Sequence, residues 1–335
     1  MTQKHTILIV GGAGYIGSHA TLAFNDAGFE TIVYDNFSTG HRDTCFGAHL
    51  VEGDLSDTAK LEKTLRHHDV DCVVHFAALI EAGQSVLTPL PFFHNNVAGT
   101  LSLLTAMQNA SVDNLVFSST AAVYGNTAQA PLLHEDMARA PINPYGASKV
   151  MVEMMLEACA QSHGLSSIAL RYFNACGADP AGRTGERHTP ETHLIPLVLQ
   201  TALGHRPNIA IHGTNYDTPD GTCIRDYVHV LDLASGHVAA VKQLLSSSCA
   251  GFTPINLGTG QGHSVRDVIH AAKAITHTEF AVIETARRAG DPAALIADAS
   301  KAQHILGWQA EHSQLDEIIS HAWSFQKDQD PGTQH

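Results

Sequence analysis

The sequence predicts an α/β protein with a doubly wound parallel sheet and a smaller α/β lobe. An apolar run at residues 6–10 leads directly into the glycine-rich stretch GGAGYIGS at 11–18. Strand-like runs then alternate with helix-like segments as far as residue 172, which is typical of parallel strands joined by right-handed crossovers. Beyond residue 174 the steady alternation stops, so a second lobe is expected there.

The first half of the chain contains six alternating units. Its expected strands lie at 6–10, 30–34, 49–52, 72–76, 114–118 and 167–172, and its longest helices at 15–27, 89–109 and 145–163. The run at 72–76 is almost continuously apolar, as a strand buried on both faces requires. The second half is expected to contain helices at 194–204, 231–245 and 265–276, the last capped by Ser264, and short strands at 209–212 and 254–257.

The glycine-rich stretch is the first indication of function. A strand, a glycine turn and a helix that opens at Tyr15 direct backbone N–H groups and the positive helix end toward one point, where a pyrophosphate binds. The glycines follow the spacing Gly11-x-x-Gly14-x-x-Gly17. That spacing alone also suits an ordinary turn, so the prediction depends on the residues that come after the helix.

Asp35 follows the second expected strand, 18 residues after Gly17. A carboxylate there accepts hydrogen bonds from the ribose of an adenine dinucleotide and repels a 2′-phosphate, and no arginine occurs at 36–38. The expected cofactor is therefore NAD, with Asp54 near its adenine and the small Ala77 letting it lie close to the backbone. The chain should then divide into a Rossmann-type NAD-binding domain at 1–173, a mainly substrate-binding lobe at 174–325 and a flexible tail at 326–335.

Composition limits the possible partners. With 19 basic and 33 acidic side chains the formal net charge is −14, which argues against nucleic acid and anionic membrane surfaces. No apolar run approaches the roughly 20 residues that span a bilayer, and residues 1–5 do not resemble an export leader, so a cytoplasmic protein is expected. The six cysteines lack a CxxC pair and should be reduced thiols. The 23 histidines show no HExxH or comparable ligand spacing, so no metal is expected, despite His188 and His193.

Tyr145 and Lys149 lie four residues apart on an expected helix, so both side chains project from one face. An ammonium beside a phenol favours the phenolate, and a cationic nicotinamide adds to this effect. The pKa of Tyr145 is therefore expected to fall from about 10 toward neutrality, making it a general base for a sugar hydroxyl. A Tyr-x-x-x-Lys pair also arises by chance on surface helices. Thr120, at the end of the fifth strand, makes the pattern more specific because its hydroxyl can share the proton.

This trio resembles the active site of the short-chain dehydrogenase/reductase superfamily, and the GxxGxxG spacing resembles that of its extended branch. Within that branch the chain is similar to the UDP-glucose 4-epimerases from Thr6 to Trp323. The matching stretches are GGAGYIGSH (11–19), DN (35–36), EGD (52–54), VVHFAA (73–78), NNVAGT (95–100), FSSTAAVYG (117–125), PYGASK (144–149), LRYFNACGA (170–178), RDYVHVLDLA (225–234), NLGTG (256–260) and ADASKA (297–302).

The resemblance implies an isomerase that holds NAD tightly and acts on a UDP-hexose. Tyr145 would take the proton from the sugar's 4-hydroxyl while the C4 hydride passes to NAD. The 4-keto sugar would then turn over and receive the hydride on its other face, which interconverts UDP-glucose and UDP-galactose. The resemblance also suggests a homodimer. An apolar face on the helix at 101–107 is compatible with a dimer and equally with core packing.

The residue patterns and the resemblance together give three sets of site residues. The expected catalytic residues are Tyr145, Lys149 and Thr120. The expected cofactor-binding residues are Gly11, Gly14, Tyr15, Ile16, Gly17, Asp35, Asn36, Asp54, Leu55, Phe76, Ala77, Asn95 and Lys149. The expected substrate-binding residues are Thr120, Tyr145, Asn174, His193, Leu194, Arg225, Tyr227, Arg288, Asp291 and Leu295. Arginine suits a diphosphate because its forked guanidinium can bind phosphate oxygens bidentately.

Several positions depart from the usual pattern of these relatives. Ile80 stands where a lysine helps to bind the cofactor phosphates, so NAD should leave this chain more readily. His193 replaces an asparagine that contacts the substrate phosphates, and Ala147 replaces the lysine of YGKSK. Leu295 falls on the position that admits or excludes a 2-acetamido group. Since leucine is intermediate between a closed tyrosine and an open cysteine, slow turnover of N-acetylated sugars is expected.

The sequence leaves three alternatives to this activity. One is epimerisation of UDP-N-acetylhexosamines or UDP-pentoses. A second is a nucleotide-sugar dehydratase, which needs an Asp-Glu pair after the threonine, whereas Thr120 is followed by Ala121 and Ala122. The third is a non-catalytic NAD-binding sensor, which would not need Thr120, Tyr145 and Lys149 together.

Overall fold

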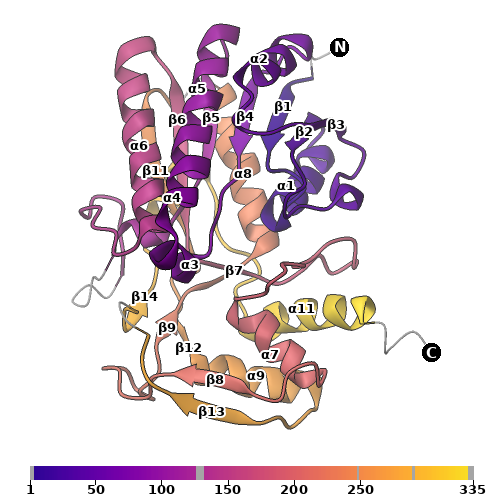
Figure 1. The fold of residues 1–335 in the computed structure, drawn as a ribbon, viewed down its shortest axis with the longest axis vertical. Coiled ribbons are helices and arrows are strands. Elements are labelled where there is room, and N and C mark those ends of the chain that lie inside the picture. The colour runs from indigo at the N-terminus through magenta and orange to yellow at the C-terminus, as the bar shows by residue number, and fades with distance from the viewer. Residues whose placement is uncertain (1–3, 126–131, 247–248, 289–290, 331–335) are drawn as a thin grey trace.

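The structure, a computed structural model, describes residues 4–125, 132–246, 249–288 and 291–330. A seven-stranded parallel sheet with helices on both faces forms the larger part, and a smaller lobe lies beyond the carboxyl ends of its strands (Figure 1). The spatial order is β11-β6-β5-β4-β1-β2-β3. The strands are β1 (Thr6–Val10), β2 (Glu30–Asp35), β3 (His49–Glu52), β4 (Cys72–His75), β5 (Asn114–Thr120), β6 (Ser166–Tyr172) and β11 (Phe252–Leu257).

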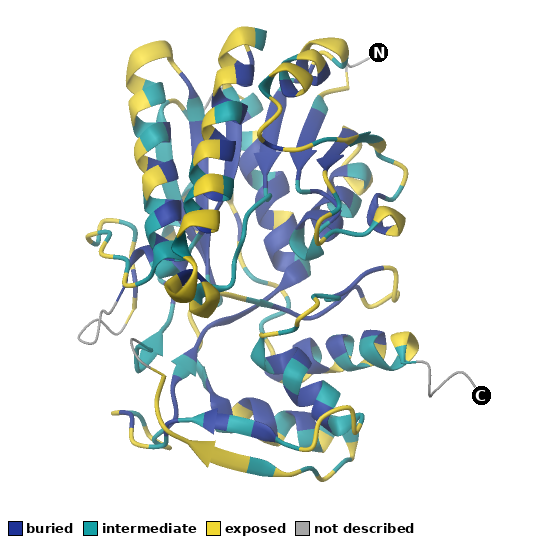
Figure 2. Cartoon of the chain, in the orientation of Figure 1, coloured by how far each residue is buried: buried dark blue, intermediate teal, exposed yellow. Residues whose placement is uncertain are grey.

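The two faces of the sheet are covered by different helices because successive residues of a strand point to opposite faces. Ile7 and Ile9 of β1 pack with α1 (Tyr15–Asp26) and α8 (Val230–Leu245). Leu8 and Val10 pack on the other face with α2 (Thr58–His67), α5 (Gly99–Ala110) and α6 (Pro144–His163). The strands are therefore buried on both sides, while the outer surfaces of the helices are exposed (Figure 2).

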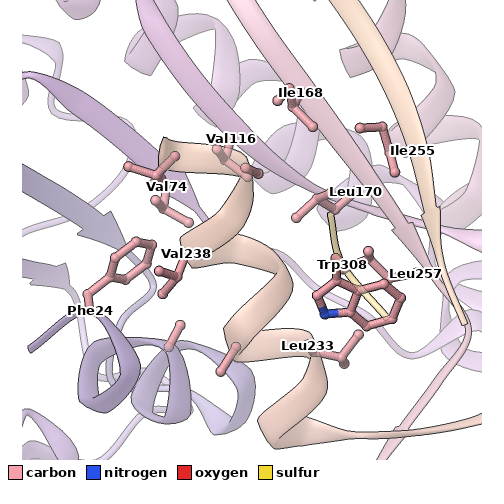
Figure 3. Close-up of a cluster of buried hydrophobic side chains, with 14 of the residues drawn as sticks. Phe24, Val74, Val116, Ile168, Leu170, Leu233, Val238, Ile255, Leu257 and Trp308 are labelled. Carbon is pink, nitrogen blue, oxygen red and sulfur yellow. The ribbon is translucent and has the colours of Figure 1, made fainter. Parts of the chain in front are cut away.

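The sequence prediction placed α8 and the strand at 254–257 in the second lobe, and the structure corrects this. β11 pairs with β6 as the seventh strand of the main sheet, and α8 packs beside α1. Leu233 and Val238 of α8 lie in one cluster with Ile255 and Leu257 of β11 (Figure 3). The chain thus leaves the sheet after β6 and returns to it, which local alternation of strands and helices could not reveal. The division of the chain at residue 173 stays a proposal.

The second lobe consists of short strands and three main helices. Its helices are α7 (Leu194–Ala202), α9 (Val265–Thr276) and α11 (Leu315–Gln329). The expected Ser264 cap of α9 is confirmed as a capping box, in which Ser264 and Asp267 bind each other's backbone N–H groups. Its strands are β7 (Asn174–Cys176), β8 (Ile209–His212), β9 (Ile224–Arg225), β10 (Tyr227–His229), β12 (His263–Ser264), β13 (Val282–Thr285) and β14 (Ala294–Leu295).

The helix expected at 89–109 is divided into three parts, which are α4 (Pro89–Phe92), a π-helical segment (Phe93–Ala98) and α5. A further short helix, α3 (Ala82–Leu87), precedes them. Within the π-helical segment Asn96 is buried, and its amide donates to the Leu79 carbonyl at 2.9 Å while its oxygen accepts from the Leu79 N–H at 2.8 Å. π-Helical turns occur often at functional sites. Here the turn fixes the chain that follows β4.

The remaining short elements are α10 (Ser300–Leu306) and two 3₁₀ turns, Arg42–Thr44 and Ala121–Val123. None of the helices in the described segments has the length and apolar character needed to cross a membrane.

We expect Gly17→Ala to lower the free energy of unfolding by ~1–3 kcal/mol, because a side chain would overpack the glycine turn. A Cβ on Gly17 would lie 2.2 Å from the Gly11 carbonyl oxygen and 2.8 Å from the Gly12 Cα. Gly14→Ala is the matched control, since its Cβ would meet the same oxygen at 3.5 Å, an ordinary contact. Urea unfolding of both variants measures the difference. Equal midpoints would show that the turn opens without cost.

Candidate active site

A cavity of about 400 Å³ lies at the carboxyl ends of the sheet strands, next to the second lobe. This is where an open parallel sheet binds its ligand, and the strand order reverses here between β4 and β1. Most of the predicted site residues line it. They are Gly11, Gly14, Tyr15, Ile16, Gly17, Asp35, Asn36, Leu55, Phe76, Ala77, Asn95, Thr120, Tyr145, Asn174, His193, Arg225 and Leu295.

The glycine turn brings backbone close to backbone at the cavity floor. Gly11 adopts φ +81°, and a Cβ on it would lie 2.5 Å from the Ala77 nitrogen, so only glycine fits there. Gly14 precedes α1 without a side-chain cap. The first N–H groups of α1 are therefore left for a ligand, and the positive end of the helix favours an anion.

Asp35 is buried and held by backbone N–H groups. Its carboxylate accepts from Ala13 at 3.0 Å and from Phe37 at 2.8 Å. Burial raises the pKa of Asp35, and these hydrogen bonds oppose that rise. Asp54 lies outside the cavity lining, where it accepts a hydrogen bond from the Asn36 amide at 2.9 Å.

Tyr145 and Lys149 lie one turn apart on α6, as predicted, but the pKa of the phenol does not follow the expectation. Burial raises the pKa of Tyr145 to about 12, although a hydrogen bond with Thr120 opposes the rise. Burial also lowers the pKa of Lys149 to about 7. The lysine Nζ donates to the Ser118 carbonyl at 2.7 Å and lies 4.8 Å from the Phe117 ring centre. In the protein without NAD, burial therefore affects the pKa values of Tyr145 and Lys149 more strongly than any attraction between the ammonium and the phenolate does.

A buried ion pair supports this part of the site. Glu153, one turn after Lys149, is fully buried and accepts from Arg171 of β6 at 2.9 and 2.6 Å. It also accepts from Ser119 of β5 at 2.7 Å. Arg171 donates in turn to the Tyr124 hydroxyl at 3.1 Å. These bonds fix α6, β5 and β6 relative to one another beside Thr120, which follows Ser119 in β5.

The second lobe supplies the rest of the predicted substrate side. Arg225 forms an ion pair with Asp291, and Arg225 lines the cavity whereas Asp291 does not. Leu295 pairs with Arg225 in the short β9–β14 ladder and packs near Tyr124. Asp226, fully buried, accepts N–H groups of Thr259, Gly260 and Ala297, which anchors this ladder.

Other predicted residues do not line the cavity. Tyr227 is buried in the core of the second lobe, Leu194 begins α7, and Arg288 is exposed. Their substrate contacts stay predictions, as does the effect of Ile80, which does line the cavity.

Sequence reasoning missed several residues of the cavity wall and its supports. Glu186 and His188 line the cavity. Asn96 and Ser148 join the loop after β4 to α6 through a 3.0 Å hydrogen bond. Asn96 stands beside the predicted Asn95, and two adjacent asparagines inside an expected helix were a sequence signal that could have pointed to it, because asparagine is a poor helix former.

The fold and the cavity agree with the relatives of this chain. Residues 7–258 match the NAD dependent epimerase/dehydratase family, and the chain belongs to that family. Its cofactor is NAD. The glycine turn, the uncapped start of α1 and Asp35 fit this group, because they offer N–H donors to a pyrophosphate and a carboxylate to a ribose.

Individual relatives are epimerases. The chain is 45% identical, over 97% of both chains, to the UDP-glucose 4-epimerase of Halalkalibacterium halodurans. The crystal structure of UDP-glucose 4-epimerase from Brucella ovis in complex with NAD is 45% identical, with a TM-score of 0.92 over 96% of this chain and 98% of that one. The Bifidobacterium longum UDP-glucose 4-epimerase in complex with NAD⁺ and UDP is 34% identical, with a TM-score of 0.91 over 98% and 99%.

We expect Glu153→Ala to lower the free energy of unfolding by ~3–5 kcal/mol, because it leaves the charge of Arg171 buried without its partner. Glu157→Ala, one turn later on α6, is the matched control. Glu157 is 37% exposed and pairs with Arg139 at 3.0 Å, so its loss should cost less than about 1 kcal/mol. Urea unfolding compares the two variants. Similar losses would contradict the structural importance of the buried pair.

Proposed function

We propose that this protein interconverts UDP-glucose and UDP-galactose by epimerisation at C4. The observation that carries the proposal is the arrangement of Tyr145 and Thr120, with Lys149 just behind them, at a cavity that is also lined by the glycine turn and Arg225. An acid–base group, a cofactor site and a phosphate-binding side chain thus meet in one place. Relatives named UDP-glucose 4-epimerase over nearly the full chain support the same substrate.

Bound NAD supplies a hydride acceptor and a positive ring charge. Tyr145 would take the proton from the 4-hydroxyl and would return it to the same oxygen at the end of the reaction. Because burial holds the pKa of Tyr145 at about 12, the phenol needs positive charge nearby before it can act as a base at neutral pH. Thr120 orients the phenol by its hydrogen bond. Lys149 is positioned by the hydrogen bond that its Nζ donates to the Ser118 carbonyl.

The cavity wall also bears on the alternatives. Ala121 and Ala122 line it directly after Thr120, and neither side chain can transfer a proton. The cavity therefore has no carboxylate at the place where a dehydratase of this superfamily would carry its acidic pair. A sensor that only binds NAD has no use for the Tyr145–Thr120 hydrogen bond.

We propose in addition that the protein is a homodimer, formed through the outer face of α3 to α6. The outer faces of these neighbouring helices are exposed (Figure 2), and they carry several large apolar side chains that are exposed. Exposed apolar surface of this kind marks association sites. These side chains are Val86, Leu87, Leu90, Leu101, Met151 and Met154. Within the expected apolar face at 101–107, by contrast, Leu103, Leu104 and Met107 pack in the core. A cytoplasmic location is proposed because all six cysteines are free thiols.

We expect Tyr145→Phe to reduce turnover of UDP-galactose by ~10²- to 10⁴-fold, because it removes the general base. Tyr172→Phe is the control, since Tyr172 also lines the cavity, where its phenol binds Ser118, without a proposed proton-transfer role. A coupled assay for UDP-glucose formation measures turnover, and NAD content and thermal unfolding check that both variants fold. If Tyr145→Phe retained the parent rate, the proposed mechanism would be wrong.

Leu295 is expected to set the preference for the sugar's 2-substituent. Leu295→Tyr should favour UDP-glucose over UDP-N-acetylglucosamine more strongly than the parent does, and Leu295→Cys should favour it less. Steric changes of this size shift discrimination by ~1–3 kcal/mol. Catalytic efficiencies for both sugar pairs, measured in the parent and the two variants, test this. Unchanged ratios in both variants would place the selectivity elsewhere in the second lobe.

A further inference from the structure

Four potential metal ligands meet in the loop that leads from β7 to α7. Glu186 and His188 lie within this loop, and Glu191 and His193 directly precede α7. Each offers one ligand atom, and the four atoms all lie within 4.8 Å of one another. Glu186, His188 and His193 also line the cavity of the active site.

The short distances converge on two atoms. Glu186 Oε1 lies 2.8 Å from Nδ1 of His188 and 2.9 Å from Nδ1 of His193. The same His193 Nδ1 lies 2.9 Å from Glu191 Oε1. A ring nitrogen carries at most one proton, so His193 Nδ1 cannot donate well to two carboxylates at once. Spacings of about 3 Å are also those of neighbouring ligands that share an ion at ~2.0–2.2 Å.

The two carboxylates of the cluster are buried and need positive charge nearby. The side chains of Glu186 and Glu191 are only 6% and 5% exposed, and no described lysine or arginine forms an ion pair with either. Arg187, between Glu186 and His188, instead binds Asp43 with two hydrogen bonds of 3.0 Å. Protonated His188 and His193 can supply positive charge to these carboxylates. One doubly charged ion, bound by the two carboxylates and two neutral imidazoles, would balance the same charge in their place.

The ligand types indicate which ion. Imidazole nitrogen with carboxylate oxygen suits zinc and its neighbours in the transition series, whereas magnesium and calcium prefer oxygen alone. The carboxylate of Glu191 is also oriented by the backbone, because its Oε1 accepts the N–H groups of the next two residues, Thr192 and His193, at 2.7 Å each. Such supporting hydrogen bonds are typical of metal ligands.

We propose that Glu186, His188, Glu191 and His193 bind one divalent transition-metal ion of the zinc class in the wall of the active-site cavity. The ion ties the loop after β7 to the start of α7 and adds positive charge beside the site. The spacing Glu-x-His-x-x-Glu-x-His matches no helical zinc motif, which is why the sequence led to the opposite expectation. A turn of the loop, and not a helix face, brings these residues together.

Cobalt and zinc binding to the full-length protein tests the site. After treatment with a chelator, the protein is titrated with Co²⁺ while the visible d–d bands are recorded, and Zn²⁺ binding is measured by equilibrium dialysis. His188→Ala and Glu186→Gln are the test variants, and thermal unfolding checks that each remains folded. The control variant carries His67→Ala and His68→Ala, because these residues form a separate histidine cluster with ring centres 4.7 Å apart.

The parent and the control variant are expected to bind one equivalent of Zn²⁺ and to show the bands of four- or five-coordinate Co²⁺. His188→Ala and Glu186→Gln should each bind ~100-fold more weakly and lose these bands, since even a supporting residue of a metal site is worth ~10- to 100-fold. Metal binding that is equally tight in the test variants, or that disappears in the His67/His68 control, would overturn the proposal. So would a parent that binds no metal. None of these readouts depends on epimerase activity.

Discussion

The active site depends on a charge that is buried together with its counter-charge. Glu153 is reached by the guanidinium of Arg171, by the Ser119 hydroxyl and, at 3.3 Å, by Arg139. Arg171 itself is almost fully buried. Burial lowers the pKa of its guanidinium, but the hydrogen bonds and the charge of Glu153 outweigh this effect and raise the pKa above its ordinary value. If either Glu153 or Arg171 moved away, the other would be left as an unpaired buried charge, which is strongly destabilising. α6, which carries Tyr145 and Lys149, therefore has one position relative to the end of β5, which carries Thr120.

The same network extends to the return of the chain into the sheet. The Tyr124 hydroxyl, bound by Arg171, donates to the Asn256 side chain of β11 at 2.6 Å. The Asn256 amide then donates to the Leu133 carbonyl at 2.7 Å. A continuous set of hydrogen bonds thus links Ser119 of β5 and Glu153 of α6 to β11, the strand that completes the sheet. Satisfied buried networks of this kind favour one arrangement of a core over others.

Much of the sheet and of the candidate site could be predicted from the sequence, because these features depend on patterns of residues that are close in the chain. The glycine turn, Asp35 and the Tyr145–Lys149 spacing each depend on residues that are close in the chain, and the structure places all of them at one cavity except Lys149, which lies just behind it. What could not be predicted depends on distant contacts. Nothing local to residues 252–257 shows that they pair with β6. Likewise the pKa of Tyr145 is governed by burial, and burial is a property of the packed molecule.

The route of the chain also has a consequence for how the molecule can be assembled. The first part of the second lobe, from β7 to β10, is inserted between two strands that are adjacent in the main sheet, β6 and β11. The rest of the lobe follows β11 in the chain. During synthesis the first six strands emerge well before the seventh, and until residue 257 is made the edge of β6 has no neighbour on that side. The main sheet therefore cannot be completed before the first part of the lobe, from β7 to β10, has been synthesised. An isolated fragment that ends at residue 173 would lack both β11 and α8, one of the two helices that cover one face of the sheet.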